Sequence, residues 1–199
     1  MGGEKKREGA IQRRTKETDI DLKVLVDGSG ETDIKSGVPF LDHMLTLFGV
    51  HGFFDLTVAA VGDTDIDDHH TVEDIGLCMG SALDQALGSR AGITRYGSAI
   101  IPMDEALSRA VIDLGGRPCL VYEIACRRKK ILDFDLNLIR EFFQAFCVQA
   151  RMNLHITQFY GKEPHHAYES VFKAFSRALR AAVKIDPREK GVPSSKGQL

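Results

Sequence analysis

The sequence has no excess of charge of either sign. Its 199 residues carry 26 lysines and arginines against 28 aspartates and glutamates, which gives a formal net charge of −2. Proteins that bind nucleic acid through its phosphates normally carry a basic patch or a strongly positive net charge. The charge balance therefore gives no reason to expect nucleic acid as a partner.

Long apolar runs are missing as well. The first twenty residues are polar, without the apolar segment of a signal peptide, and no run is long enough to span a bilayer. The four cysteines, at positions 78, 119, 126 and 147, show no Cys-x-x-Cys spacing and are interpreted as reduced thiols. These absences favour a cytoplasmic protein that does not associate with membranes.

Histidine is scarce, yet four of the seven histidines lie in two copies of one pattern. The pattern is His-His-x-x-Glu, at residues 69–73 and 165–169. On a helix each histidine shares a face with the glutamate, but the two adjacent histidines project about 100° apart. Two metal ions that each take one histidine are the easier geometry. The alternatives are a surface histidine pair or a helix start with an acidic first turn, and the repetition favours the metal.

The repetition extends upstream of the histidine pairs. His69 and His165 are 96 residues apart, whereas Phe48 and Phe146 are 98 residues apart. At the longer step the repeat aligns His43 with Glu141. Internal repeats of this length usually mean two copies of one structural unit. The repeat nominates four metal ligands in each half: His43, His69, His70 and Glu73, then Glu141, His165, His166 and Glu169.

One further histidine competes with Glu141 for the last ligand position. His155 aligns with Thr57 inside a strand-like run, so we expect that it is not a ligand. The sequence alone leaves open whether Glu141 or His155 completes the metal set.

Hydrophobic periodicity predicts an α/β fold of the layered α+β type, with helices packed on a mixed sheet. Residues 27–30 are predicted to form a hairpin turn, and residues 1–14 to be mobile until they join a strand. We expect one domain over residues 1–199, made of repeats at about 15–90 and 91–186 with a tail at 187–199. The predicted strands are residues 18–26, 31–35, 54–61, 107–114, 119–125 and 154–160, and the predicted helices are residues 42–48, 72–87, 138–149 and 167–183.

Imidazole and carboxylate ligands without thiolates disfavour a structural zinc site. Such a set suits Mn²⁺ or Fe²⁺, with Zn²⁺ or Ni²⁺ as substitutes. Basic residues beside glycine-rich backbone can hold a phosphate, and beside a metal site they indicate a phosphorylated substrate. The candidates are Arg95, Arg117, Lys173 and Lys196.

Six short motifs together resemble the imidazoleglycerol-phosphate dehydratase family, in the right order from about residue 14 to the C-terminus. They are Pro-Phe-Leu-Asp-His-Met-Leu at 39–45, Asp-Asp-His-His-Thr-Val-Glu-Asp at 67–74, Arg-Tyr-Gly at 95–97, Pro-Met-Asp-Glu-Ala at 102–106, Gly-Arg-Pro at 116–118 and Phe-Lys-Ala at 172–174. The sequence departs from the family at Glu141, where many members have histidine, and in the loop at residues 161–164, where asparagine is common.

The resemblance implies a hydro-lyase of histidine biosynthesis that converts D-erythro-imidazoleglycerol phosphate to imidazole acetol phosphate. It also implies two Mn²⁺ per subunit, a homo-oligomeric shell of 24 subunits with the sites at subunit interfaces, and a duplicated β-α half like the second domain of ribosomal protein S5. The substrate contacts that it implies fall on Glu17, Arg95, Arg117, Lys173, Ser195 and Lys196.

The mechanism that follows is a hypothesis. No carbonyl acidifies the C–H bond to be broken, so a metal-bound imidazolate is expected to absorb the developing charge. The candidate catalytic carboxylates are Glu17, Glu73 and Glu169, with Glu169 or Glu17 favoured as the base. Two rivals are a dimetal phosphate hydrolase, which would release inorganic phosphate, and a protein whose metals only hold an assembly together.

Overall fold

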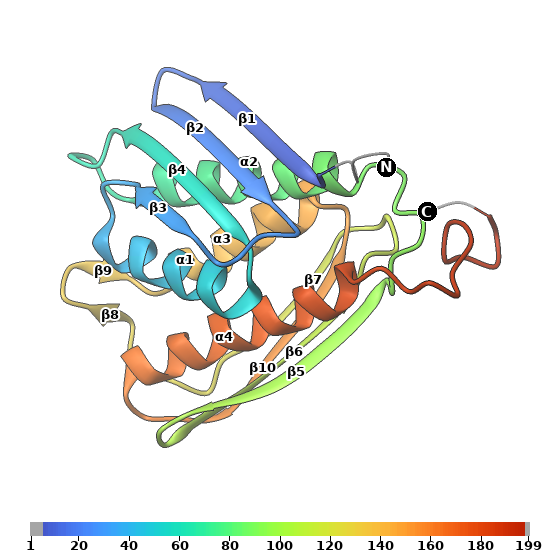
Figure 1. The fold of residues 1–199 in the computed structure, drawn as a ribbon. Helices are drawn as coiled ribbons and strands as arrows, with labels where there is room; N and C mark the ends of the chain where they lie inside the picture. Colours follow the sequence, from blue (N-terminus) through green and yellow to red (C-terminus); the bar gives the residue numbers. More distant parts are fainter. Residues whose placement is uncertain (1–5, 198–199) are drawn as a thin grey trace.

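Two four-stranded sheets with four helices between them form the fold, which a computed structural model describes for residues 6–197 (Figure 1). Residues 1–5 and 198–199 lie outside the described residues, and with them the ends of the predicted mobile segment and of the predicted tail. In chain order the elements are β1 (Glu8–Arg14), β2 (Thr18–Leu25), β3 (Thr32–Lys35), α1 (Pro39–Gly52), β4 (Asp55–Gly62), α2 (His69–Leu87), β5 (Tyr96–Met103), β6 (Ala106–Asp113), β7 (Cys119–Glu123), β8 (Lys130–Ile131), β9 (Phe134–Asp135), α3 (Leu138–Gln149), β10 (Asn153–Tyr160) and α4 (Pro164–Val183).

The two sheets have the same topology. Their strand orders are β1-β2-β4-β3 and β5-β6-β10-β7. In each sheet the first three strands are antiparallel and the fourth is parallel to its neighbour. The register repeats as well, because Lys23 pairs with Thr57 in the first sheet and Val111 with His155 in the second. The predicted duplication of a β-α half and the predicted mixed sheets are therefore confirmed.

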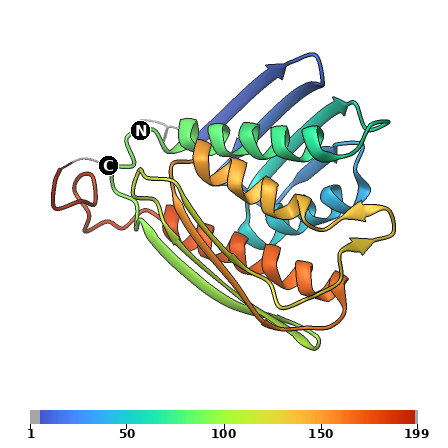
Figure 2. The same cartoon turned by 180° about the vertical axis from the view of Figure 1, so that it is seen from behind.

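The apolar pattern explains why the helices lie inside. In β2, Ile20, Leu22 and Val24 are buried and alternate with more exposed residues, so one face of the sheet is apolar. Helices α1 and α2 cover that face, α3 and α4 cover the second sheet, and the helices pack as α2 on α3 and α1 on α4 (Figure 2). Within residues 6–197, none of the helices is long and apolar enough to cross a membrane.

Two glycines at equivalent positions let a strand cross close to a helix. A Cβ atom on Gly9 would lie 1.9 Å from the Ala82 carbonyl oxygen of α2, and one on Gly97 would lie 2.0 Å from the Ala178 carbonyl oxygen of α4. Any larger residue at either position would push β1 or β5 off its helix. The duplication thus extends to the closest backbone contacts.

The predicted hairpin at residues 27–30 is wrong. Strand β3 pairs in parallel with β4, not with β2, whose two edges are taken by β1 and β4. The connecting loop is held by the Asp55 carboxylate, whose Oδ1 accepts hydrogen bonds from the backbone N–H groups of Ser29, Gly30 and Glu31 at 2.7, 2.9 and 3.0 Å. These bonds fix the loop that leads from β2 to β3, which lies on the edge of β4 away from β2.

Other expectations differ from the structure in extent, among them the helix predicted at residues 42–48, which spans residues 39–52 as α1. Residues 8–14 form β1, so most of the described part of the expected mobile segment is a strand. Residues 96–103 form β5, which was not predicted. Helices α2 and α4 each begin three residues before the predicted start, so both histidine pairs lie in the first turn of their helices.

Candidate metal and substrate site

Helices α1 and α4 bring three of the predicted ligands together. Atom Nε2 of His43 lies 2.9 Å from Oε1 of Glu169, and Nε2 of His165 lies 3.0 Å from the same oxygen. One ligand atom from each residue lies within 4.8 Å of the other two, which is the spacing that a single metal ion requires. We call these three residues the α1–α4 cluster.

The local sequence explains how the cluster forms. Pro164 stands in the first turn of α4, where a missing N–H costs nothing, and the Glu163 carboxylate accepts a hydrogen bond from the His165 N–H. His165 and Glu169 are four residues apart and therefore share a helix face. Since α1 packs on α4, His43 reaches the same point from the first half of the chain.

The cluster centres on a buried carboxylate. The side chain of Glu169 is only 9% exposed, and its Oε2 accepts a hydrogen bond from the Lys173 ammonium at 2.6 Å. Burial opposes ionisation, but Lys173 and the hydrogen bonds from His43 and His165 outweigh it and lower the pKa of Glu169 to about 2. Glu169 is therefore anionic at neutral pH.

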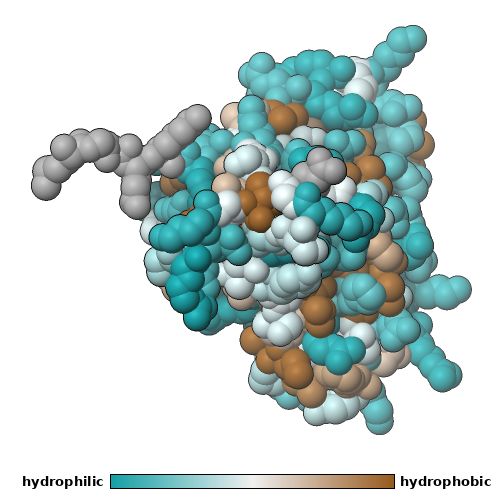
Figure 3. Space-filling model, turned by 90° about the vertical axis from the view of Figure 1, so that its right-hand side faces the viewer, coloured by the Kyte–Doolittle hydropathy of each residue, from teal (hydrophilic) through white to brown (hydrophobic). Residues whose placement is uncertain are grey.

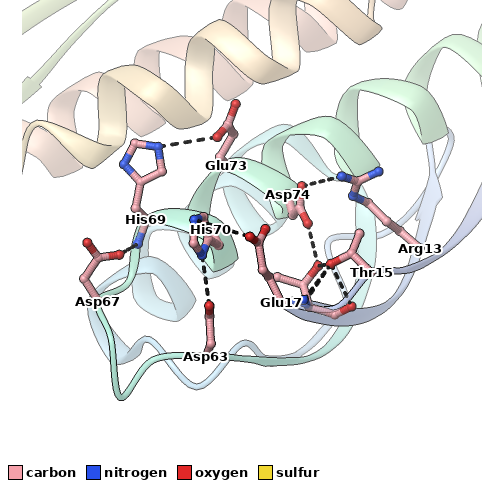
Figure 4. A network of polar contacts seen from close by, with 10 residues as sticks. Arg13, Thr15, Glu17, Asp63, Asp67, His69, His70, Glu73 and Asp74 are labelled. Carbon is pink, nitrogen blue, oxygen red and sulfur yellow. Dashed lines mark hydrogen bonds and ion pairs between the residues drawn. The ribbon is translucent and has the colours of Figure 1, made fainter.

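The equivalent residues of the first half lie farther apart (Figure 4). Nε2 of His69 lies 3.4 Å from the half-exposed carboxylate of Glu73. His70 points elsewhere: its Nδ1 lies 3.0 Å from Asp63, and its Nε2 lies 3.9 Å from Glu17. The adjacent histidines thus turn toward different partners, as their projection about 100° apart on a helix requires.

His166 is also held by a carboxylate that the sequence reasoning missed. Its Nδ1 lies 2.7 Å from Oε2 of Glu105, in the turn between β5 and β6, and this bond lowers the pKa of Glu105 to about 2. A signal for this residue was present in the sequence. Glu105 stands 88 residues after Glu17, and β6 begins 88 residues after β2. Asp63, which holds His70, has no such counterpart.

Two other predicted residues do not join the α1–α4 cluster. Glu141, in the first turn of α3, lies 3.1 Å from Nη1 of Arg140. His155 is exposed on β10, between the buried residues Leu154 and Ile156, and so faces away from the helices.

The predicted phosphate contacts divide between two regions. Lys173 touches the α1–α4 cluster. The N–H of Arg95 donates to the carbonyl of Ala182 at the other end of α4, and the Arg95 side chain is bonded to Asp113 and to Pro193 in the tail. Thirteen residues of helix separate Glu169 from Ala182, or about 20 Å. The other predicted contacts are exposed. Arg117 lies between β6 and β7, and Ser195 and Lys196 lie in the tail.

The fold and the cluster define a class: a duplicated β-α protein with a histidine–carboxylate site suited to a divalent metal ion. Comparison with known proteins gives the family. Residues 36–179 match the family model described as imidazoleglycerol-phosphate dehydratase. The chain therefore belongs to the imidazoleglycerol-phosphate dehydratase family of histidine biosynthesis, and it is a hydro-lyase.

Curated relatives and solved structures agree. The chain is 53% identical over 193 residues to the imidazoleglycerol-phosphate dehydratase of Geobacillus sp. (strain WCH70), covering 97% of this chain and 99% of the relative. It is 55% identical over 187 residues to that of Bacillus subtilis (strain 168), covering 94% and 96%. The crystal structure of the Staphylococcus aureus enzyme matches with a TM-score of 0.81 at 38% identity, covering 90% of this chain and 99% of the solved chain. The structure of the Pyrococcus furiosus enzyme in complex with (S)-C348 matches with a TM-score of 0.77 at 35% identity, covering 95% of this chain and 100% of the solved chain.

Proposed function

We propose that the protein dehydrates D-erythro-imidazoleglycerol phosphate to imidazole acetol phosphate, with two Mn²⁺ bound per subunit. The observation that carries the proposal is the α1–α4 cluster, two histidines around a buried anionic glutamate in a chain of this family. In this proposal the chain is one domain made of two repeats. It acts in the cytoplasm, where we expect a bacterial enzyme of histidine biosynthesis to work.

The residues present fit a divalent ion. The cluster offers two imidazole nitrogens and one carboxylate oxygen at a common point, and no cysteine stands among them. These donors suit Mn²⁺ and leave positions for substrate on a six-coordinate ion. An ion bound there supplies Lewis acidity, which stabilises negative charge on the imidazole ring of the substrate.

The remaining predicted ligands support a site completed by other subunits. His69, His70, Glu73 and His166 lie in half-exposed positions at the starts of α2 and α4. The Arg95 N–H, which should lie near the bound phosphate, donates to the carbonyl of Ala182, about 20 Å along α4 from Glu169, too far for one small substrate to touch both within one chain. We therefore propose that neighbouring copies complete each site in a shell of 24 subunits.

The outer surfaces of the chain are compatible with such an assembly. Several large apolar side chains are exposed on the second sheet or at its edges, and apolar side chains gather in the lower half of the surface in Figure 3, among polar ones. Contiguous exposed apolar patches commonly mark interfaces. The exposed large apolar side chains on the strands of the second sheet are Tyr96, Ile100, Val111, Phe159 and Tyr160.

Glu17 is the better candidate for the base. Both oxygens of Glu169 are engaged, Oε1 by the two histidines and Oε2 by Lys173. The Glu17 carboxylate is 54% exposed, and its nearest ionic partner is His70 at 3.9 Å. A carboxylate with a free oxygen can accept the C–H proton while a protonated group gives a proton to the neighbouring hydroxyl, which leaves as water. The enol that forms then tautomerises to the ketone.

The product decides between this proposal and its rivals. Purified protein loaded with Mn²⁺ and supplied with imidazoleglycerol phosphate should form a ketone that absorbs in alkali, without release of inorganic phosphate. Phosphate release would favour the dimetal hydrolase, and the absence of both products would favour metals that only hold the assembly together.

The assembly has a separate test. Size-exclusion chromatography with light scattering, before and after treatment with a chelator, should show a smaller particle once the metal is gone. An unchanged mass at complete metal loss would contradict sites at subunit interfaces without touching the ligand assignment.

A further inference from the structure

We propose that Asp113 is a positioning residue for the phosphate end of the substrate site: it fixes Arg95, and Arg95 in turn holds the tail that carries Ser195 and Lys196. The substrate in this inference rests on the proposed function. The geometry rests on contacts at the end of α4 that lies far from the α1–α4 cluster.

Asp113 and Arg95 form a two-point contact. Nε of Arg95 donates to Oδ1 of Asp113 at 2.7 Å, and Nη2 donates to Oδ2 at 3.1 Å. The side chains are only 13% and 21% exposed, so water screens the pair less than a surface ion pair. A carboxylate that meets two donors of one guanidinium fixes the plane of that group as well as its charge.

The same guanidinium docks the C-terminal tail. Nη1 of Arg95 donates to the carbonyl oxygen of Pro193 at 2.8 Å, two residues before Ser195. A guanidinium has five N–H donors, and these contacts use three of them. Two donors remain for a phosphate, so Arg95 can hold the tail and meet the substrate at once.

The backbone around this pair is shaped to fit it. A Cβ atom on Gly115 would lie 2.7 Å from Oδ2 of Asp113 and 2.9 Å from Nη2 of Arg95, so the pair occupies space that only glycine leaves. Arg95 itself has φ +71°, a left-handed conformation that residues other than glycine rarely adopt. Its N–H donates to Ala182, and its carbonyl accepts from the N–H of Leu114 at 3.1 Å.

These contacts give Asp113 an indirect role in phosphate binding. A carboxylate repels phosphate, so Asp113 acts through Arg95. Without the carboxylate, the guanidinium loses its fixed plane, the Pro193 carbonyl loses a fixed donor, and Ser195 and Lys196 are released together. Substrate binding and tail docking should therefore fail in the same variant.

The experiment compares Asp113→Asn and Asp113→Glu with the wild type and with Asp21→Asn. Asp21 is a matched control, because it pairs with Arg14 at 2.7 Å on β2 and is exposed. The first readout is limited trypsin digestion of the metal-loaded protein, followed by intact mass, for cleavage after Lys190 and Lys196. We expect Asp113→Asn to speed this cleavage about tenfold, Asp113→Glu to restore part of the protection, and Asp21→Asn to match the wild type.

The second readout is steady-state kinetics with imidazoleglycerol phosphate. Asp113→Asn should raise KM by about ten- to a hundredfold with a smaller change in kcat, at wild-type metal content. Unchanged cleavage would overturn the docking of the tail by Arg95. Faster cleavage with an unchanged KM would overturn the role of the docked tail in substrate binding.

Gly115→Ala gives a second variant that leaves every charge in place. Its Cβ should displace the Asp113–Arg95 pair and speed tail cleavage in the same way, and wild-type protection would contradict the geometry. Because the digestion needs no substrate, it tests the docking of the tail even if the protein fails to turn over imidazoleglycerol phosphate. A failure of the proposed function is thereby distinguished from a failure of this inference.

Discussion

The two halves share a backbone plan but differ in how their His-His-x-x-Glu patterns are supported. In the second half Glu169 is buried and touches His43, His165 and Lys173. In the first half Glu73 is half-exposed, and its ionic contact is with His69 at 3.4 Å. The fold therefore provides two equivalent positions, of which one is assembled within the chain and the other is open.

The side chains opposite each glutamate explain the difference. His43 on α1 faces Glu169, whereas the repeat puts Glu141 on α3 at the equivalent position, where a second carboxylate would repel Glu73. The position equivalent to Lys173 is Leu77, so the first half has no ammonium there. Opposite charges bring the second set together, whereas in the first set Glu141 pairs with its neighbour Arg140 and Glu73 with His69.

The largest effect expected concerns the assembled set. Glu169→Gln removes the anionic ligand on which His43 and His165 converge, so the affinity of chelator-treated protein for Mn²⁺ should fall about a hundredfold or more. Isothermal titration with Mn²⁺ measures it. Glu73→Gln is the matched variant in the open set and should cost less. The comparison fails if the two substitutions weaken metal binding equally.

The second prediction removes the ammonium that distinguishes the halves. Lys173→Leu copies the residue at the equivalent position of the first half and leaves Glu169 buried without its lysine. In metal-free protein at pH 6 we expect a loss of about 2–3 kcal/mol in the free energy of unfolding. Urea denaturation at fixed protein concentration measures it. Lys35→Leu, which breaks the exposed pair with Asp33, is the control and should cost much less, because water screens an exposed ion pair.

The pH dependence of this effect has a definite sign. The folded-state pKa of Glu169, about 2, lies below the value of about 4.3 expected in the unfolded chain. The stabilisation from its ionised form is therefore complete above about pH 4.3 and is lost as the pH falls toward 2. The difference between wild type and Lys173→Leu should shrink over that range, and a constant difference would mean that Lys173 stabilises the protein by packing alone.

The fold could be predicted in its parts but not in its pairing. The helix at Leu138–Gln149 was predicted at both ends, because its apolar residues recur at helical spacing. The strand that pairs with β3 could not be predicted. The alternation of apolar and polar residues in a strand shows which face is buried, but not which strand lies beside it. Strand β5 was missed because Tyr96–Met103 contains Gly97 and Pro102, which weaken the strand pattern.

The site could be predicted where the chemistry lies in the spacing. The four-residue step joins His165 to Glu169, and the repeat nominates His43, which the structure brings to the same point. The carboxylates of Asp63, Glu105 and Asp113 come from turns or strand ends and meet their partners only through the fold. Hydrophobic periodicity does not reveal such residues. Glu105 is the exception, because the internal repeat aligns it with Glu17. The assignment of the full ligand set stays a prediction.

The third prediction asks whether one residue accounts for the open set. Glu141→His puts at this position the imidazole that His43 supplies in the other half, so a neutral ligand replaces the second carboxylate opposite Glu73. We expect the Mn²⁺ affinity of the weaker of the two sites to rise about tenfold. The reason is that the ion no longer has to overcome the mutual repulsion of two carboxylates. Isothermal titration of Glu141→His measures the gain, and Glu73→Gln in the same background should abolish it. An unchanged affinity would show that position 141 does not complete a metal site.

The smallest effect belongs to His155, a histidine that the repeat leaves out of the metal set. His155 pairs in register with Val111 and Val121 on the face of the second sheet turned away from the helices, and its first-half equivalent is Thr57. We expect His155→Ala to keep the wild-type metal content and to change the free energy of unfolding by less than about 0.5 kcal/mol, as is usual for an exposed position. Metal analysis of the purified variant, alongside His43→Ala and Glu141→Ala, provides the measurement. If His155→Ala loses metal while Glu141→Ala keeps all of it, the repeat has aligned the wrong residue, and a neighbouring copy must bring the outer face of β10 to the metal.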